Sequence, residues 1–240
     1  MLKQLLPFLI ALLFFSTAHS QVKNVTFYFK TGIQFRNTDK FTEALDAFNK
    51  AISLNKYFDS AYVEMGNIFL NIGNTDNAIT AYKIAISINS KYTEALIAMG
   101  KLYRDTKQNF DSSIFYYTKA VAIDTRNKDI WYGLAWVYNA KKEYDNAINF
   151  AAKALEVDNT YKPAYNELGH AYRGSQKFTE GIEQFKKNLA VSEVDLAYLY
   201  SGFCYTELKD KASAMEMHEK LNKINEKMAN ALKKKIDAMQ

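Results

Sequence analysis

The chain has few of the residues that cross-link or interrupt a polypeptide. It contains one cysteine, Cys204, and two prolines among 240 residues. A single cysteine excludes an intramolecular disulfide, so the stability of the fold has to come from packing. No stretch alternates apolar and polar residues for long enough to predict a β-strand. These absences favour an all-α protein whose core is drawn from its 48% hydrophobic residues.

The sequence also lacks the groups that an enzyme or a metal site brings together. His170 and His218 are far apart, and neither belongs to a spacing of His, Cys and Asp that would hold a metal ion. No glycine-rich phosphate loop, nucleophile elbow or HExxH motif occurs. We therefore expect no catalytic residue, no metal and no cofactor. A net charge of +5 is too small for this length to indicate a nucleic-acid partner.

Residues 1–20 have the composition of a cleavable signal peptide. Lys3 precedes the apolar run 5–15, and the small residues of Ala18-His19-Ser20 favour cleavage before Gln21. An uncleaved anchor is the alternative, but a bilayer needs about 20 apolar residues. We expect an exported protein, periplasmic or secreted, with no transmembrane span after cleavage. Abundant Asn and Lys with few prolines favour a bacterial over a eukaryotic source.

Small and large residues recur every 33 to 35 residues through the rest of the chain. A first column of small residues comprises Gly32, Gly66, Gly100, Ala135, Gly169 and Gly202. A second column of small residues comprises Ala44, Ala78, Ser113, Ala147, Gly181 and Ala214. A column of mostly aromatic residues comprises Phe48, Tyr82, Tyr117, Ala151, Phe185 and His218. Self-similarity at this period indicates a repeat architecture.

Each repeat is predicted to be a pair of antiparallel helices. In the second repeat Tyr62, Met65 and Phe69 share one helical face, and the breaker pair Gly73-Asn74 marks the turn. Two helices approach closely only where the facing side chains are small, so we expect Gly66 to touch Ala78. One pair cannot bury these faces alone, and neighbouring pairs must therefore stack.

The motif Trp131-x-x-Leu134-Ala135-x-x-Tyr138 of the fourth repeat resembles the tetratricopeptide repeat family, whose unit has about 34 residues. The resemblance extends over residues 25–223 and implies a right-handed α-solenoid of antiparallel helix pairs, a superhelix with a C-terminal capping helix. It divides the domain at 21–225 into six repeats: 25–58, 59–92, 93–127, 128–161, 162–194 and 195–225.

The last part of the chain departs from this pattern. One residue is gained near Gln108 and one is lost near Ser192, both predicted to lie in turns. The sixth repeat is degenerate, and Cys204 is predicted to pack inside it as a small apolar residue. Residues 226–240 are predicted to form the capping helix. It would pack on the sixth repeat through an apolar stripe made of Ile224, Met228, Leu232, Ile236 and Met239.

In the resembling family, ligand-facing residues lie on the first helix of each pair and line a concave groove. The matching positions here are Phe29, Arg36, Asn67, Asn71, Lys101, Arg104, Tyr132, Trp136, Asn139, Asn166, His170 and Arg173. Arg36, Arg104 and Arg173 occupy one column in alternate repeats. The alternative is that these charged residues only solvate the inner face. Asn139 is expected to be dispensable for stability.

These residues predict a non-enzymatic, exported scaffold that binds a protein or peptide in its groove, in the assembly of a cell-envelope complex. Arginine pairs with carboxylates and tryptophan anchors interfaces, so an acidic partner with an aromatic or apolar anchor would fit. One alternative is a structural subunit that uses its convex face or C-terminal helix. Another is a module that binds an envelope polymer or glycan through Tyr132 and Trp136.

Overall fold

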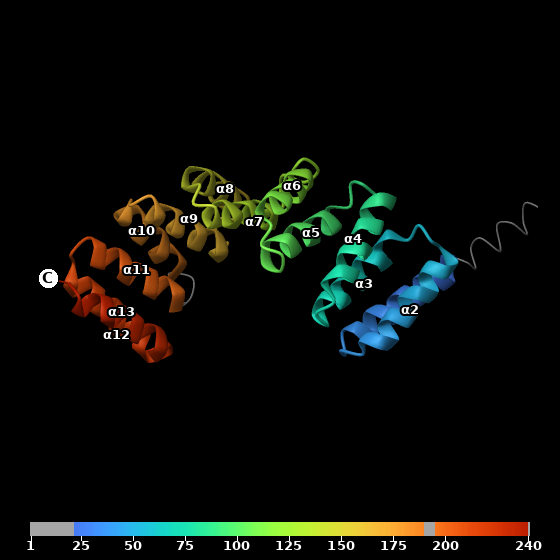
Figure 1. Cartoon of the computed structure of the whole chain (residues 1–240), viewed down its shortest axis with the longest axis horizontal. Helices are drawn as coiled ribbons and strands as arrows, with labels where there is room; N and C mark the ends of the chain where they lie inside the picture. Colours follow the sequence, from blue (N-terminus) through green and yellow to red (C-terminus); the bar gives the residue numbers. More distant parts are fainter. Residues whose placement is uncertain (1–21, 190–194, 240) are drawn as a thin grey trace, which may run out of the picture. The chain divides into compact units, whose positions relative to one another are not determined.

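The computed structural model describes residues 22–189 and 195–239, and every regular element over these ranges is an α-helix (Figure 1). The first helix covers residues 22–36. The helices that follow are α2 (Phe41–Leu54), α3 (Asp59–Asn71), α4 (Thr75–Ile88), α5 (Thr93–Asp105), α6 (Phe110–Val121), α7 (Lys128–Ala140), α8 (Tyr144–Val157), α9 (Lys162–Gly174), α10 (Phe178–Leu189), α11 (Asp195–Glu207), α12 (Lys211–Ile224) and α13 (Glu226–Asp237). The predicted all-α class is confirmed.

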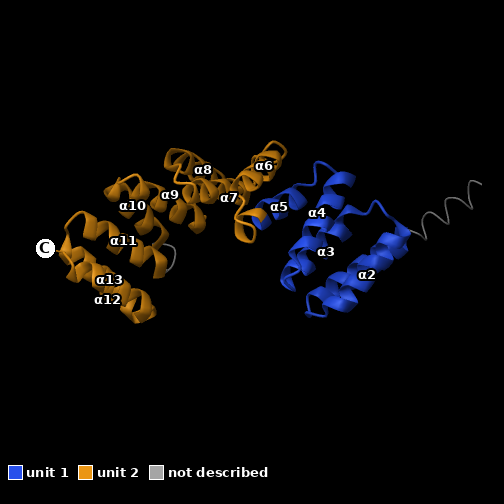
Figure 2. Ribbon diagram, in the orientation of Figure 1, with its two compact units in different colours: residues 1–102 blue, residues 103–240 orange. Residues whose placement is uncertain are grey.

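The helices form two compact units, with the boundary after Leu102, inside α5 (Figure 2). In the first unit α3 packs on α2 and on α4. In the second unit the pairs α7–α8, α9–α10 and α11–α12 pack along the chain, and α9 also contacts α7 and α11. This packing of consecutive helix pairs confirms the predicted α-solenoid. The predicted leader, residues 1–20, lies outside the described residues.

One residue in the turn between the two helices of each pair has a positive φ angle. These residues are Asp39, Gly73, Gln108, Lys142, Gln176 and Lys209. The predicted turn at Gly73-Asn74 is confirmed, and the Asn74 side chain accepts a hydrogen bond from the Asn77 N–H to cap α4. The extra residue near Gln108 falls in this series of turns, whereas the residue lost near Ser192 lies outside the described residues.

The first glycine column exists because an aromatic ring of the second helix lies on it. A Cβ atom on Gly66 would be 2.5 Å from Cε1 of Tyr82, and one on Gly169 would be 2.5 Å from Cε1 of Phe185. Gly66 is therefore required mainly by the Tyr82 ring, and not by the expected contact with Ala78. A Cβ on Gly181, in the second column, would lie 3.3 Å from the main-chain oxygen of Gly169, so that column does face backbone.

The fourth and sixth repeats depart from this packing. In the fourth repeat Ala151 replaces the ring and Ala135 replaces the glycine, and both are buried in one cluster. In the sixth repeat the glycine is kept as Gly202, but its space is taken by Leu232 of α13. The capping helix thus supplies the side chain that the degenerate repeat lacks.

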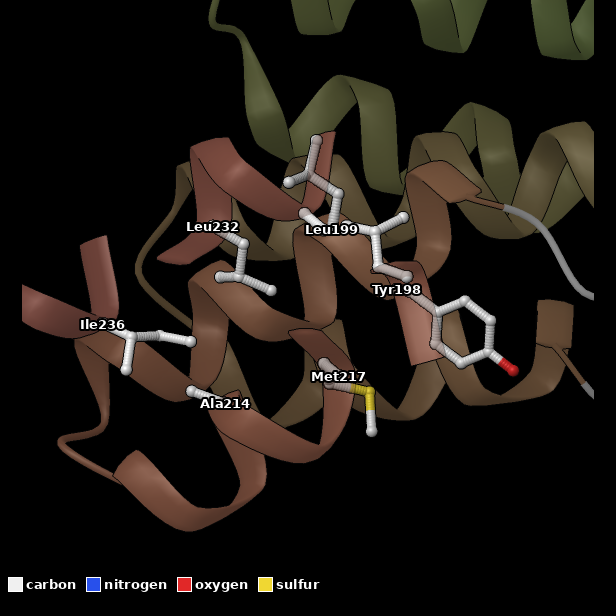
Figure 3. Packing of buried hydrophobic residues seen from close by; sticks show 8 residues of the cluster. Tyr198, Leu199, Ala214, Met217, Leu232 and Ile236 are labelled. Atoms are coloured by element: carbon white, nitrogen blue, oxygen red, sulfur yellow. The ribbon is translucent and has the colours of Figure 1, made fainter. Parts of the chain in front are cut away.

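The apolar stripe of α13 packs on α11 and α12, as predicted (Figure 3). Leu232 and Ile236 are buried, and Met228 and Met239 pack against the same cluster. Ile224 was wrongly included in the stripe, because it ends α12 and is 44% exposed. Cys204 is buried, and burial raises the pKa of its thiol to about 11, which confirms its expected role as a small core residue.

Candidate functional site

A cleft of about 350 Å³ opens between α7, α9 and α11, which are three successive first helices of the second unit. We call it the α7–α9–α11 cleft. It is lined by Trp136, Asn139, Ala140, Tyr144, Glu167, His170, Arg173, Gly174 and Tyr200. Four of these, Trp136, Asn139, His170 and Arg173, are among the predicted groove residues. The prediction therefore found part of a real concavity in this unit.

Helix α9 supplies the polar side of the cleft. Glu167, His170 and Arg173 are three residues apart and consequently project from one side of the helix. Pro163 stands in the first turn of α9, where its missing N–H costs no helical hydrogen bond. The regular helix between Pro163 and Arg173 holds the three side chains in fixed order along the cleft.

Arg173 carries the positive charge of the cleft. Its guanidinium lies over the ring of Tyr200, with 5.1 Å from Cζ to the ring centroid. Within residues 22–189 and 195–239 no carboxylate forms an ion pair with it, and its buried Nε has no hydrogen-bond partner. Because Nε is covered by protein, a ligand would reach this side chain through its terminal Nη atoms.

The other two arginines of the predicted column are already paired. Arg36 forms an ion pair with Glu64, on α3. Arg104 donates from Nε and Nη2 to the two carboxylate oxygens of Asp105, at 2.5 and 2.9 Å, and its side chain is 10% exposed. The three arginines are therefore not equivalent, and Arg173 is the one whose charge is not already balanced by a partner in the described residues.

The two rings of the predicted aromatic centre, Tyr132 and Trp136, are partly covered by other side chains. The Arg104 guanidinium lies 5.2 Å from the Trp136 ring centroid and 5.7 Å from that of Tyr132. Phe110 meets Trp136 edge to face, and Tyr161 meets Tyr132 in the same way. Tyr132 does not line the cleft. The two rings are therefore packed against protein rather than standing free as a pair of stacking platforms.

Asn139 links α7 to α9. Its Nδ2 donates to the main-chain oxygen of Glu167 and to Oε2 of the same residue, at 2.8 Å each. Both amide hydrogens are thus used, and the buried Oδ1 has no partner. These contacts argue against the expectation that Asn139 is dispensable for stability, because its loss would remove two hydrogen bonds between neighbouring repeats.

Two ionisable side chains of the cleft have shifted pKa values. Burial raises the pKa of Glu167 to about 7, and the hydrogen bond from Asn139 and the charge of Arg104 only partly offset this effect. Burial, reinforced by the nearby Arg173 charge, lowers the pKa of His170 to about 4. His170 also packs edge to face on Tyr200, with ring centroids 4.1 Å apart. At neutral pH the cleft therefore holds a neutral imidazole and a carboxyl group near its midpoint.

The remaining predicted groove residues have other surroundings. Phe29 packs on Phe48 and Phe58 in the core of the first unit. Asn67 accepts a 2.7 Å hydrogen bond from the Tyr82 hydroxyl, and Asn166 accepts one of 2.5 Å from Asn188. Asn71 and Lys101 are exposed.

The sequence prediction missed Glu167, Tyr144 and Tyr200. Glu167 is one helical turn before the predicted His170 and Arg173, so the spacing along α9 could have identified it. Tyr144 begins α8, a second helix of its pair, and Tyr200 comes from the degenerate sixth repeat, where the family pattern is a poor guide. Among the described residues no group of three or more His, Cys, Asp or Glu could hold a metal ion.

Within the part of the chain that the structure describes, no helix combines the length and the apolarity needed to cross a membrane. Stacked helix pairs with a period of about 34 residues define the chain as a helical-repeat protein. Its sequence matches the tetratricopeptide repeat family at residues 59–92 and 106–171. The chain belongs to the tetratricopeptide repeat family, whose fold is that of a protein-interaction scaffold.

Solved structures of similar fold agree with this assignment. PilF of Pseudomonas aeruginosa superposes with a TM-score of 0.77 at 12% identity, over 90% of this chain and 99% of that one. PilW, a type IV pilus biogenesis factor, gives 0.77 at 14% identity, over 87% and 97%. YrrB, a repeat protein with an unusual peptide-binding site, gives 0.66 at 22% identity, over 79% and 99%. No curated protein sequence matches the chain.

Proposed function

We propose that the protein is an exported, non-enzymatic scaffold that binds a protein or peptide partner in the α7–α9–α11 cleft. One observation carries this proposal: Arg173 lines the cleft without an ion-pair partner among the described residues. A partly buried cation without a counter-charge is costly, and an acidic group of a partner would offset that cost. The family's fold supports a peptide ligand, and so does the similarity to YrrB, which has a peptide-binding site.

The chemistry of the cleft favours an acidic segment with an aromatic or apolar anchor. Arg173 offers its Nη groups to a carboxylate. The parts of Trp136 and Tyr200 that line the cleft provide apolar surface on either side of the polar helix α9. The acidic character of the partner follows from Arg173, and the anchor follows from the two rings. On the first unit, Asn71 and Lys101 stay candidate contacts because both are exposed.

A role in assembling a cell-envelope complex is consistent with two further observations. Residues 1–20 have the pattern of a signal peptide, which supports export, and the periplasm or the extracellular space as the location. PilW, one of the similar structures, is named a pilus biogenesis factor. Export itself is tested by the N-terminal sequence of the mature protein, which should begin at Gln21.

The alternative of a structural subunit is favoured by exposed apolar side chains away from the cleft, such as Phe115 on α6, which is 51% exposed. The alternative of a glycan-binding module is less well supported, because Arg104 already lies over the rings of Tyr132 and Trp136. The cleft therefore remains the better candidate for the binding surface.

The test introduces a larger, uncharged side chain that should fill the cleft. Ala140 is exposed and lines the cleft, so Ala140→Tyr should obstruct it with little effect on folding. Ala212→Tyr on α12 is the matched control, because Ala212 is also exposed. Affinity capture from the native envelope, quantified by mass spectrometry, should lose partners with Ala140→Tyr only. Equal recovery with both variants would contradict binding in the cleft, and a loss with Phe115→Ser alone would favour the structural subunit.

A further inference from the structure

The α7–α9–α11 cleft contains an acid as well as a cation, and the two are not paired. Glu167 and Arg173 lie on the same side of α9, and no ion pair joins Glu167 to any cation within the described ranges. The carboxyl group is held instead by the neutral amide of Asn139 on α7, at 2.8 Å. An acidic ligand that reaches Arg173 therefore enters a cleft that already holds a carboxyl group.

We propose that binding of an acidic side chain in this cleft is coupled to protonation of Glu167, so that the partner binds more tightly as the pH falls. The inference rests on the proposed function, because it assumes that the cleft is the binding surface. Two carboxylates that share a poorly solvated site repel each other, and the repulsion is relieved when one of them takes up a proton. The partner's acid keeps its charge because Arg173 pairs with it. Glu167 takes the proton because only an uncharged amide holds it.

Among the groups that face the cleft, Glu167 is the one expected to change its charge between pH 6 and 8. From its own helix His170 and the Arg173 guanidinium face the cleft, and the pKa of about 4 keeps His170 neutral above pH 5. From α7 come Asn139 and the Tyr132 phenol, and burial raises the pKa of that phenol. The further facing groups are Arg104 of α5, the Tyr144 phenol of α8 and the Tyr200 phenol of α11.

The helix α10 contributes no charge to this arrangement. It meets α9 through Phe185 and Gly181, and through the amide of Asn188, which donates to Asn166. Burial raises the pKa of Glu167 to about 7, a pH at which an aspartate or glutamate side chain of a partner is charged. A ligand carboxylate would move that titration to higher pH, which is the coupling that the proposal requires.

The experiment titrates the full chain with a hexa-aspartate peptide, using hexa-asparagine as the uncharged control. Aspartate titrates near 3.9, so the probe keeps its charge between pH 6 and 8. If binding raises the pKa of Glu167 by about one unit, the Kd should fall on the order of fivefold from pH 8 to pH 6. Calorimetry in buffers of different ionisation enthalpy should show proton uptake near pH 7.5. Hexa-asparagine should show neither effect.

Three variants assign the effects to residues. Glu167→Gln should keep the binding of hexa-aspartate but lose its pH dependence and its proton uptake. Arg173→Gln should lose the binding, and Lys177→Gln, which removes an exposed lysine after α9, should behave as the wild type. The wild-type chain gives a readout without any mutation: the carboxyl carbon resonance of Glu167 should titrate at higher pH when the probe is bound.

The outcomes separate this inference from the proposed function. Binding that needs Arg173 but is equally tight at pH 6 and 8, without proton uptake, would overturn the coupling and leave the cleft as the binding surface. An Arg173-independent interaction with hexa-aspartate would overturn the acidic specificity as well. A pH-dependent interaction with hexa-aspartate, together with partner capture that Ala140→Tyr does not affect, would support the coupling and contradict the proposed function.

Discussion

The side-chain amide of Asn139 donates both of its hydrogens to Glu167, which is 28 residues further along the chain. The amide therefore joins the first helices of two neighbouring repeats at the wall of the cleft. The main-chain oxygen of Glu167 fixes the orientation of the amide, since a rotated Asn139 would bring its own oxygen against it. Glu167 is thereby held in the cleft by a neutral partner, which leaves its charge free to vary with pH.

Other polar contacts tie the two helices of a single repeat together at their ends. The Asn89 amide donates to Asp59 at 3.1 Å, and the Asn225 amide donates to Asp195 at 2.8 Å. Lys128 donates to Asp158 at 2.5 Å. Each contact joins residues 30 positions apart, close to one period, so it recurs where the sequence repeats. Each contact thus joins the start of the first helix of a pair to the end of its second helix.

Glu167 and His170 should give stability two opposite dependences on pH. The raised pKa of Glu167 makes stability fall as the pH rises from about 4.5 to 7, because the unfolded chain loses its proton first. The lowered pKa of His170 makes stability rise from about pH 4 to 6.5, because the unfolded chain binds the proton first. In the wild type the two slopes should largely cancel over their common range.

The variants should uncover the two slopes separately. As the pH rises from 4.5 to 6.5, the free energy of unfolding of Glu167→Gln should increase, because only the His170 effect remains. That of His170→Phe should decrease over the same range, because only the Glu167 effect remains. Each slope should be roughly 1.4 kcal/mol per pH unit at most. Urea unfolding at several pH values measures both. Parallel curves for the wild type and the two variants would show that neither group has a shifted pKa.

Gly66→Leu should lower the free energy of unfolding by about 1–3 kcal/mol. Its new side chain would overlap the buried ring of Tyr82, which lies where the Cβ would be. Lys83→Leu on α4 is the control, because Lys83 is exposed and a leucine there meets no packed ring. Thermal unfolding of both variants checks the expectation, and equal melting temperatures would refute the assignment of the glycine column to ring packing.

Gln176→Gly should raise stability by about 0.5–1 kcal/mol. Gln176 has φ of 64°, a left-handed conformation that costs a residue with a Cβ more than it costs glycine. Gly73→Ala, in the corresponding turn of the second repeat, should have the opposite effect, because Gly73 has φ of 78°. Thermal unfolding should therefore move in opposite directions for the two variants. A gain of stability in Gly73→Ala would contradict this account of the turns.

Leu232→Ala should destabilise the second unit by about 2–5 kcal/mol. Leu232 is buried and occupies the space beside Gly202 that an aromatic ring fills in other repeats. Deletion of residues 226–240 should go further and promote self-association, because it uncovers the apolar cluster around Leu199 and Leu221. Sedimentation or light scattering measures association. A deletion variant that stays monomeric with an unchanged melting temperature would show that α13 is dispensable.

Much of the fold could be predicted because each repeat encodes its own packing locally. The spacing of Gly66, Phe69 and Gly73 was enough to predict a helix and the turn after it. The face was predicted less well, because Phe69 is only half-buried and the buried residues of α3 are Ala61, Val63, Gly66 and Ile68. The prediction failed where a contact comes from outside the repeat. Ile224 was assigned to the capping stripe from periodicity alone. Asn139 was expected to matter little for stability, and the local pattern did not show its bond to Glu167, 28 residues away.

The sequence by itself determined the helical pairs and their period, because these depend on residues a few positions apart. Only the tertiary structure decided which groove arginine is available. Arg36 forms an ion pair with Glu64 of the next repeat, and Arg104 forms one with Asp105 while it lies over two aromatic rings. Arg173 forms no ion pair with a carboxylate within the described residues. Burial against neighbouring helices also set the pKa of Glu167, and burial depends on residues that the local pattern does not contain.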